Sequence, residues 1–422
     1  MRKLRVADFL VFALLATVAV AQPPAGDGAQ EVVIKINGLF CPFCTFGIEK
    51  RLKSLPEVAK VRTDLAAGEA IATLKPGAQF LQQRFARAVK KAGFTHSGIS
   101  VRPARLEARR TAVPPAVETP QGRPPHTSGG AAFAFVKVMG RRGAAPGQFN
   151  QPTTLAFGPE GWFVVSDSGN GRVQQFHPDG RPWRQWSVAG DGKSPLRKPV
   201  GVAVGPEGDI WVTDYEADTI NRYGPDGAPA GMFGKPGDGP GEFDAPADVA
   251  VTSDGLLAVA DFYNHRVQLL TRAGRLVLVM GARGPSRRSS SAGLNYPTRV
   301  AAGPDGLIWA ADAYNHRVVA FDREGRLVRG FGKKGRAPGR FNVSSGIAPL
   351  SANRLAVADF TNHRIQIWTS EGQFLADFGF RGSRVGQFER PTDVALAPTG
   401  ELYVVDWGNH RIQVFREGGR PQ

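Results

Sequence analysis

Cysteine is nearly absent from this chain of 422 residues, which contains only Cys41 and Cys44. Two cysteines three positions apart form one local site, so no disulfide framework connects distant parts of the chain. Long apolar runs are also scarce. The longest, Phe9–Val20, has 12 residues, whereas a membrane-spanning helix needs roughly 20. The sequence therefore excludes a disulfide-rich scaffold and predicts no transmembrane span in the mature chain.

The short apolar run has the flanks of a secretory signal. Arg2, Lys3 and Arg5 precede it, and the small-residue sequence Ala19-Val20-Ala21 follows its centre. A basic start, an apolar middle and small residues before a cleavage point are the layout of a signal peptide. We expect residues 1–21 to be removed and the protein to be exported, to the periplasm or the extracellular space.

Acidic residues are few relative to basic ones, with 37 Asp and Glu against 53 Lys and Arg and a formal net charge of +16. The excess is concentrated in residues 1–130, which hold 19 basic and 9 acidic residues. A basic chain suggests nucleic-acid binding, but an exported protein rarely meets nucleic acid. We therefore expect no nucleic-acid partner, and attribute the charge to anionic envelope surfaces or solubility.

The second half of the chain repeats one motif. An Asp is followed three residues later by Asn-His-Arg-Val/Ile in four copies, and two degenerate copies precede these at Asp167 and Asp214. The spacings between the six Asp residues are 47, 47, 51, 47 and 47, for Asp167, Asp214, Asp261, Asp312, Asp359 and Asp406. A fixed period in the forties indicates a repeat architecture.

Each unit contains short β-branched runs separated by turn sequences such as Pro304-Asp305-Gly306. Four strands per unit, six times, predict an all-β six-bladed propeller over residues 131–418. The motif resembles the NHL-repeat family. The last unit stops after its third strand, so we expect Phe133–Met139 to supply the missing strand and close the ring.

The sequence predicts a different structure for residues 31–101. Alternating strands at Glu31–Asn37, Val58–Leu65, Glu69–Lys75 and Phe94–Val101 are separated by two amphipathic helices, the first carrying Ile48 and Leu52. The order βαββαβ gives a small sheet with both helices on one side. The predicted fold class is thus an α+β ferredoxin-like domain followed by the propeller. Residues 102–130, with six Pro and five Arg, read as a flexible linker.

The only cysteines stand in Gly38-Leu39-Phe40-Cys41-Pro42-Phe43-Cys44, a loop that opens the first helix. With Leu55-Pro56-Glu57-Val58 and Lys91-Ala92-Gly93-Phe94, this segment resembles the heavy-metal-associated domain of copper chaperones and of the periplasmic mercury-binding protein. The resemblance implies that Cys41 and Cys44 bind a soft metal ion. Cu(I) is the first choice and Hg(II) or Zn(II) are alternatives, because thiolate sulfur at a helix N-terminus suits such ions.

Two other functions remain open for this chain. Pro42 between the cysteines also suits a thiol–disulfide redox protein or a disulfide of an oxidising compartment. Lyases that release amidated peptides use a related propeller with metal-bound histidines, so His265, His316, His363 and His410 raise the question of an enzyme. Equivalent positions in successive blades cannot all meet at one metal. We therefore expect a structural role for these residues and no catalytic site.

The innermost strands predict a polar ring around the propeller axis. One residue of each unit, two positions after the start of its innermost strand, should face the axis. These residues are Thr154, Gly201, Asp248, Arg299, Gly346 and Asp393. The longest unit adds a basic insertion containing Arg283, Arg287 and Arg288 on the same face. Such a face commonly binds partners. We expect an envelope protein or an anionic ligand to bind at Thr154, Asp248, Arg299 and Asp393 together with the three inserted arginines.

Overall fold

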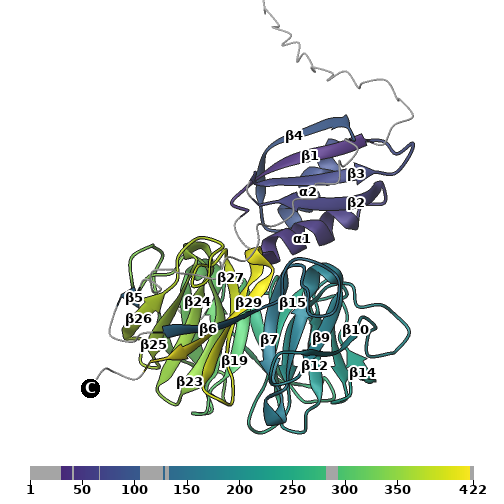
Figure 1. Cartoon of the computed structure of the whole chain (residues 1–422). Helices are drawn as coiled ribbons and strands as arrows, with labels where there is room; N and C mark the ends of the chain where they lie inside the picture. The colour runs from purple at the N-terminus through teal and green to yellow at the C-terminus, as the bar shows by residue number, and fades with distance from the viewer. Residues whose placement is uncertain are drawn as a thin grey trace, which may run out of the picture.

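The computed structural model describes residues 30–39, 42–65, 67–104, 127–128, 133–281 and 293–418. A small α+β module comes first and a larger all-β body follows, and the two lie in contact (Figure 1). No helix of this described part is long and apolar enough to cross a membrane. The expected signal peptide lies outside the described residues.

The N-terminal module alternates strands and helices. Its elements are β1 (Gln30–Asn37), α1 (Pro42–Lys53), β2 (Val58–Asp64), β3 (Glu69–Leu74), α2 (Gln82–Lys91) and β4 (Thr95–Pro103). The strands form one antiparallel sheet in the order β2-β3-β1-β4. Val32 and Ile34 of β1 are buried in one cluster with Leu52 of α1 and Phe85 of α2. Since β1 alternates with period two, its apolar face is the one that both helices cover.

The large body consists of antiparallel sheets that we call blades 1 to 6 in chain order. Blade 1 contains β7 (Pro152–Phe157), β8 (Phe163–Asp167), β9 (Arg172–Phe176) and β10 (Pro182–Trp186). Blade 2 contains β11 (Pro199–Val204), β12 (Ile210–Asp214), β13 (Thr219–Tyr223) and β14 (Pro229–Phe233). Blade 3 contains β15 (Pro246–Val251), β16 (Leu257–Asp261), β17 (Arg266–Leu270) and β18 (Leu276–Met280).

Blades 4 to 6 follow the same plan. Blade 4 contains β19 (Pro297–Ala302), β20 (Ile308–Asp312), β21 (Arg317–Phe321) and β22 (Leu327–Phe331). Blade 5 contains β23 (Ser344–Ser351), β24 (Arg354–Asp359), β25 (Arg364–Thr369) and β26 (Phe374–Phe378). Blade 6 contains β27 (Pro391–Leu396), β28 (Glu401–Asp406), β29 (Arg411–Glu417) and β6 (Phe133–Met139).

The innermost strands contact one another in a closed ring, β7, β11, β15, β19, β23, β27 and back to β7. The body is therefore a propeller-like fold. The expected closure is confirmed, because β6 pairs with β29 in antiparallel register, with Met139 opposite Ile412. Closing blade 6 with a strand from the start of the repeat region removes an unpaired sheet edge.

A short strand departs from the expected linker. β5 (Thr127–Ser128) pairs with β26 at the outer edge of blade 5 and makes that sheet five-stranded. An outer edge offers unpaired backbone groups, and a passing segment can satisfy them without any sequence signal. Residues 105–126 and 129–132 of the predicted linker lie outside the described residues.

Short 3₁₀ turns join several second and third strands of the blades. They are η2 (Ser168–Asn170), η3 (Ala313–Asn315), η4 (Phe360–Asn362) and η5 (Trp407–Asn409), and η1 (Pro159–Gly161) lies between β7 and β8. After η3, η4 and η5 comes the motif histidine, with φ of 55° to 60° at His316, His363 and His410. A non-glycine residue in this region needs compensating contacts, and the next subsection describes them.

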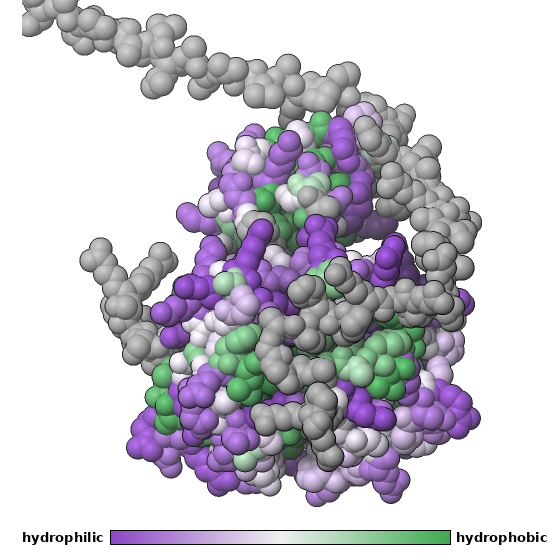
Figure 2. All heavy atoms as spheres, turned by 60° about the vertical axis from the view of Figure 1, so that its left-hand side comes forward, coloured by the Kyte–Doolittle hydropathy of each residue, from purple (hydrophilic) through white to green (hydrophobic). Residues whose placement is uncertain are grey.

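The exposed apolar side chains of the propeller lie mainly on the outermost strands. They include Val136, Trp183, Met232, Val277, Val328 and Leu375. Figure 2 shows hydrophobic surface in separate patches on the side of the propeller below the module, with hydrophilic residues around them. Scattered exposed apolar residues are usual for a folded protein, so they identify no binding surface.

Candidate functional site: the cysteine loop on the propeller

Cys44 lies in the first turn of α1, which faces the propeller (Figure 1). Its side chain is fully buried and disulfide-bonded. Cys41, the other predicted metal ligand, lies outside the described residues. Tyr314, which follows β20 of blade 4, places its hydroxyl 2.6 Å from Cys44 Sγ. The cysteine that the sequence singled out therefore touches the second body of the protein.

Phe43 fixes the start of α1 on the propeller. Its side chain is 1% exposed, and its ring centroid lies 5.9 Å from that of Phe262 and 6.3 Å from that of Tyr215. The Tyr215 hydroxyl donates a hydrogen bond of 2.8 Å to the Phe43 carbonyl. The guanidinium of Arg299 lies 5.2 Å from the Phe43 ring centroid, in cation–π range.

Basic side chains of α1 meet acidic side chains of blades 2 and 3. Lys50 Nζ lies 2.5 Å from Asp218 Oδ1. Arg51 Nη2 lies 2.5 Å from Asp244 Oδ2, and Lys53 Nζ lies 3.2 Å from Glu216 Oε2. The first two pairs are mostly sheltered from solvent, so water and salt screen them less than an exposed pair.

Two glycines of the module lie directly under propeller tyrosines. A Cβ atom on Gly47 of α1 would stand 1.6 Å from the Tyr263 hydroxyl oxygen, and one on Gly93 would stand 1.9 Å from that of Tyr296. Neither position has room for a side chain. One buried apolar cluster also runs from the module core through Phe43 to Tyr215 and Phe262, so the two bodies share a continuous core.

Four of the predicted ring residues come together in the propeller. Thr154, Asp248, Arg299 and Asp393 line a cavity of about 330 Å³ on the innermost strands. Gly201 and Gly346 complete the ring. A Cβ atom on them would lie 2.5 Å and 2.4 Å from the Cα atoms of Asp248 and Asp393, so close approach of the next inner strand requires glycine there.

Arg299 is fully engaged inside the ring. Its Nε lies 3.4 Å from Asp393 Oδ1, and its two terminal nitrogens donate to the carbonyl oxygens of Thr298 and Thr153. Phe43 covers the guanidinium from the module side. The sequence predicts Arg299 on a face that binds a partner or an anionic ligand, but the structure buries its side chain and Phe43 of the module covers its guanidinium.

Asp248 is the ring residue with the most unusual electrostatics. Its Oδ2 accepts a hydrogen bond of 3.0 Å from the Val300 backbone nitrogen, whereas Oδ1 has no hydrogen-bond partner among the described residues. Burial, with a further contribution from the nearby charge of Asp393, raises the pKa of Asp248 to about 7, although Arg299 opposes the shift. The group therefore titrates near neutral pH.

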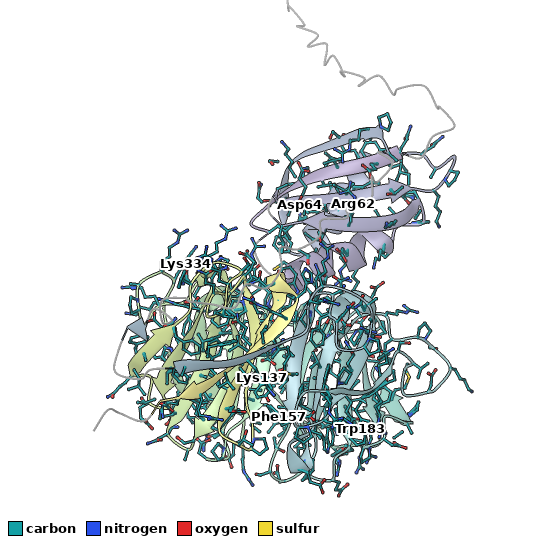
Figure 3. All side chains as sticks on the ribbon, viewed as in Figure 1. Arg62, Asp64, Lys137, Phe157, Trp183 and Lys334 are labelled. Atoms are coloured by element: carbon teal, nitrogen blue, oxygen red, sulfur yellow. The ribbon has the colours of Figure 1, made fainter. Side chains whose placement is uncertain are left out.

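The cavity opens at the end of the propeller opposite the module. Its lining continues along the inner strands to their last residues, among them Phe157, Val251 and Leu396. Phe157 lies far from the module, whereas Lys334, in the connection from β22 to the inner strand β23, lies on the module side (Figure 3). The module thus covers the channel end where the inner strands begin.

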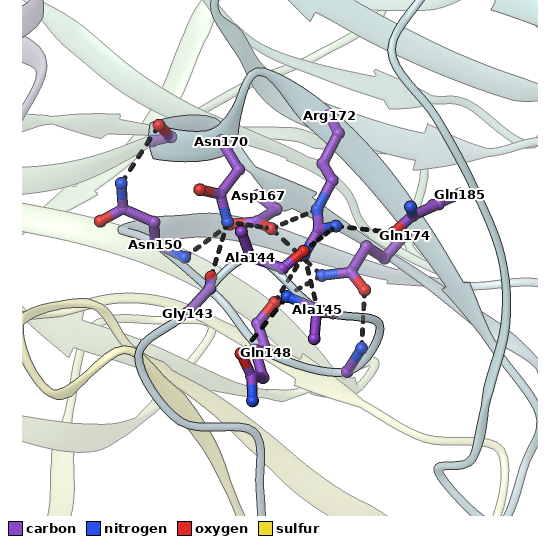
Figure 4. Close-up of polar contacts among 12 residues, drawn as sticks. Gly143, Ala144, Ala145, Gln148, Asn150, Asp167, Asn170, Arg172, Gln174 and Gln185 are labelled. Carbon is purple, nitrogen blue, oxygen red and sulfur yellow. Dashed lines mark hydrogen bonds and ion pairs between the residues drawn. The ribbon is translucent and has the colours of Figure 1, made fainter.

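The repeated Asp residues hold each blade together. Asp167 Oδ1 accepts from the Asn150 backbone nitrogen at 2.7 Å. Its Oδ2 accepts from Asn170 Nδ2, Arg172 Nε and Gln174 Nε2 (Figure 4). The same contacts recur at Asp261, Asp359 and Asp406. These hydrogen bonds confirm the predicted structural role of the repeated Asp residues.

The histidines join neighbouring blades. Nδ1 of His265, His316, His363 and His410 accepts a backbone N–H from the residue before the next inner strand, at 3.0 to 3.2 Å. Burial, together with the charge of Arg142, lowers the pKa of His410 to about 4. A neutral imidazole has the lone pair that this hydrogen bond needs. Among the described residues, no group of three or more His, Cys, Asp or Glu gathers to hold a metal ion.

The sequence did not predict the tyrosines of the propeller that contact the module. Tyr215, Tyr263, Tyr296 and Tyr314 lie on one face, although the chain has only 6 tyrosines. Tyr215 stands one residue after a motif Asp, and Tyr263 and Tyr314 stand two residues after one, only in the second to fourth units. Tyrosines at these positions in only three of the six units indicate that one side of the propeller surface differs from the rest. Arg283, Arg287 and Arg288 lie outside the described residues.

The NHL-repeat family matches residues 149–176, 196–220, 243–268, 294–321 and 388–415. The chain therefore carries NHL repeats. The unit around Asp359 is not among these segments, yet its Asp359 accepts the same bonds as the other motif Asp residues.

A stretch of 75 residues is 36% identical to RING finger protein nhl-1 of Caenorhabditis elegans and covers 18% of this chain. The chain spans only 7% of that relative's length. A gluconolactonase from Xanthomonas campestris has a TM-score of 0.51 at 15% identity, over 70% of this chain and 95% of that one. A protein of unknown function from Bacteroides thetaiotaomicron has a TM-score of 0.50 at 14% identity, over 69% and 77%. These two solved structures share the fold.

Proposed function

We propose that this chain is an exported protein that binds one soft metal ion through Cys41 and Cys44, with the NHL propeller as the scaffold of the metal-binding module. In this proposal the module is a ferredoxin-like, heavy-metal-associated domain. The observation that carries it is the position of Cys44, in the first turn of a helix that follows the first strand of a β2-β3-β1-β4 sheet. The partial positive charge at a helix N-terminus favours the thiolate form of such a cysteine.

The donor chemistry fits a soft ion of low coordination number. Two cysteine sulfurs are the strongest soft donors in the chain, and Tyr314 contributes only a hydroxyl beside Cys44. Structural zinc sites usually have four protein ligands, so Cu(I) or Hg(II) suits two thiolates better. The metal-binding form is the reduced form, because a disulfide sulfur has no thiolate to offer.

Titration of Cu(I) into the reduced full-length protein tests the proposal. One tight site is expected in the wild type, measured by competition with a Cu(I) chelator, and Cys41→Ser or Cys44→Ser should abolish it. His177→Ala is the control, since it alters a metal-ligating residue type on the propeller, where the ring stacks on Trp183 far from the module (Figure 3). Equal Cu(I) affinity of the wild type and Cys44→Ser would contradict the proposal.

Export is part of the same proposal and rests on residues 1–21. Expression with the natural N-terminus should yield a shortened mature chain in the periplasm or the medium. Sequencing of its N-terminus measures the cleavage position, expected near Ala21. An intact N-terminus in the cytosolic fraction would contradict export.

A thiol–disulfide redox function is the second candidate, and the disulfide-bonded state of Cys44 favours it. A labile disulfide has a reduction potential well above about −300 mV, whereas structural disulfides lie below that value. Equilibration of the full-length protein with glutathione buffers of graded ratio measures this potential. A value below about −300 mV, within the range of structural disulfides, would remove the redox candidate and leave metal binding.

A further inference from the structure

The contact between the two bodies buries the group on which the proposed function depends. Cys44 has no exposed surface and Phe43 is 1% exposed. The Tyr314 hydroxyl contacts Cys44 Sγ, and the rings of Tyr215 and Phe262 pack on Phe43. Metal transfer and thiol exchange both require another sulfur or a metal carrier to approach Cys44 closely. In the docked arrangement no such approach is open, so reaction at Cys44 requires the contact to separate.

Blade 2 departs from the repeat where α1 docks. Asp218 takes the position that histidine has in blades 3 to 6. Its Oδ1 accepts the Ala245 backbone N–H at 2.6 Å, as the histidines do for the next blade, and the same oxygen also receives Lys50 Nζ. A neutral imidazole nitrogen could accept the first bond but would offer no charge to the lysine. The substitution preserves the blade contact and adds a binding group for α1.

The remaining interface combines fitted and ionic contacts. Gly47 and Gly93 leave room for the rings of Tyr263 and Tyr296, while Arg51 and Lys53 face Asp244 and Glu216. Lys198 of the propeller also lies 4.0 Å from the ring centroid of Phe46. Fitted packing makes the contact specific, and ion pairs make it responsive to salt.

We propose that the N-terminal module is a reversible cap on the propeller, which shields Cys44 and the module-side end of the channel when docked and exposes both when it separates. The proposal depends on the proposed function only in taking Cys44 as the reactive group. Undocking exposes the sulfur and the face formed by Tyr215, Tyr263 and Tyr314 in one step, so anything that binds that face also releases the sulfur.

The test measures the alkylation rate of Cys44 by iodoacetamide, an uncharged reagent, in the full-length Cys41→Ser protein. Gly47→Ala places a methyl group against Tyr263 and should speed alkylation about tenfold or more, since a buried thiol reacts through the open form. Gly98→Ala is its control, because a Cβ atom at Gly98 has no neighbour within 4 Å.

A second variant weakens the cap through charge. Lys50→Ala with Arg51→Ala should also speed alkylation about tenfold, since it removes two sheltered ion pairs. Arg84→Ala with Arg87→Ala on α2 changes the net charge equally but leaves the interface intact. Salt should accelerate alkylation of the parent protein and have less effect on the Lys50 and Arg51 variant.

Faster alkylation in both interface variants, with no change in either control, supports the cap. Parent-like rates in both interface variants, or an equal rise in the controls, would overturn it. Cu(I) titration of the wild type tests the proposed function independently of the cap. A missing Cu(I) site would count against the proposed function, while the alkylation rates would still decide whether the cap exists.

Discussion

At the scale of single residues, the motif Asp is the centre of each blade's polar network. Asp406 receives the Glu389 backbone N–H and the side chains of Asn409, Arg411 and Gln413. Its side chain is fully buried. A buried charge remains favourable only while its partners are in place, so these residues act as one unit.

Replacing Asp406 with Ala should therefore destabilise the propeller strongly. The change leaves the Arg411 guanidinium without its carboxylate, and removing one member of a buried ion pair costs about 3–5 kcal/mol. Urea unfolding followed by tryptophan fluorescence measures the loss. Glu324→Ala, at an exposed turn, is the control and should change the free energy of unfolding by less than about 0.5 kcal/mol. Equal losses in the two variants would contradict this role.

Asp248 should make stability depend on pH in an unusual direction. Its folded pKa of about 7 is above the unfolded value of about 3.9. The folded state therefore binds the Asp248 proton more tightly than the unfolded state does. The resulting contribution to the free energy of unfolding is complete below about pH 4. It is lost as pH rises to about 7, by at most about 1.4 kcal/mol per pH unit.

Comparison with Asp248→Asn isolates this contribution from those of other carboxyl groups. The difference in free energy of unfolding between wild type and variant should fall as pH rises from about 4 to about 7 and be constant above that range. Urea titrations at several pH values measure it. A difference independent of pH would show that Asp248 has an ordinary pKa.

At the scale of elements, β6 closes the propeller and joins blades 5 and 6. Phe133, its first residue, is buried, and its ring stacks on that of Phe378 in blade 5 with centroids 4.6 Å apart. The strand also pairs with β29 along its length. Closure thus combines backbone hydrogen bonds within blade 6 with side-chain packing on blade 5.

Phe133→Ala should weaken this closure. Truncating a buried phenylalanine costs about 3–5 kcal/mol, and the loss should appear first as faster hydrogen exchange in β6 and β29. Val136→Ala, on the same strand but 37% exposed, is the control and should leave exchange near that of the wild type. If hydrogen exchange in β6 and β29 is as slow in both variants as in the wild type, β6 contributes little to closure.

At the scale of the whole molecule, docking of the module makes two folding units share one apolar core. The ion pairs of Lys50 and Arg51 and the packing of Phe43 hold α1 against blades 2 to 4. The cavity inside the ring extends to the ends of the inner strands on the side opposite the module. A partner that uses the module-side face must first displace the module.

Separation of the module should be visible in solution scattering. Gly47→Ala should increase the radius of gyration relative to the wild type, because the clash with Tyr263 moves the module off the propeller. Gly98→Ala should leave the radius unchanged. Circular dichroism of both variants should match the wild type, since alanine is favoured over glycine in the helix that holds Gly47, and a methyl group at Gly98 of β4 meets no neighbour within 4 Å. An unchanged radius in Gly47→Ala would mean that the interface adapts to the methyl group.

The sequence by itself determined the repeat, its period and its closing strand. A 47-residue period in the Asp motif, together with a last unit that lacks its fourth strand, leaves few folds that satisfy both. The sequence also indicated which inner-strand residues meet at the axis, because equivalent positions in successive blades must lie around one ring. Local patterning and periodicity are sufficient for these features.

Only the tertiary structure decided where the module lies and what this does to Cys44. The contacts of Lys50 with Asp218 and of Cys44 with Tyr314 join residues 168 and 270 positions apart. No periodic pattern encodes such pairs, since each depends on how two separately folded surfaces match. The same match buried Arg299 under Phe43, so a ring that the sequence presented as an open binding face is closed on that side by the protein's own helix.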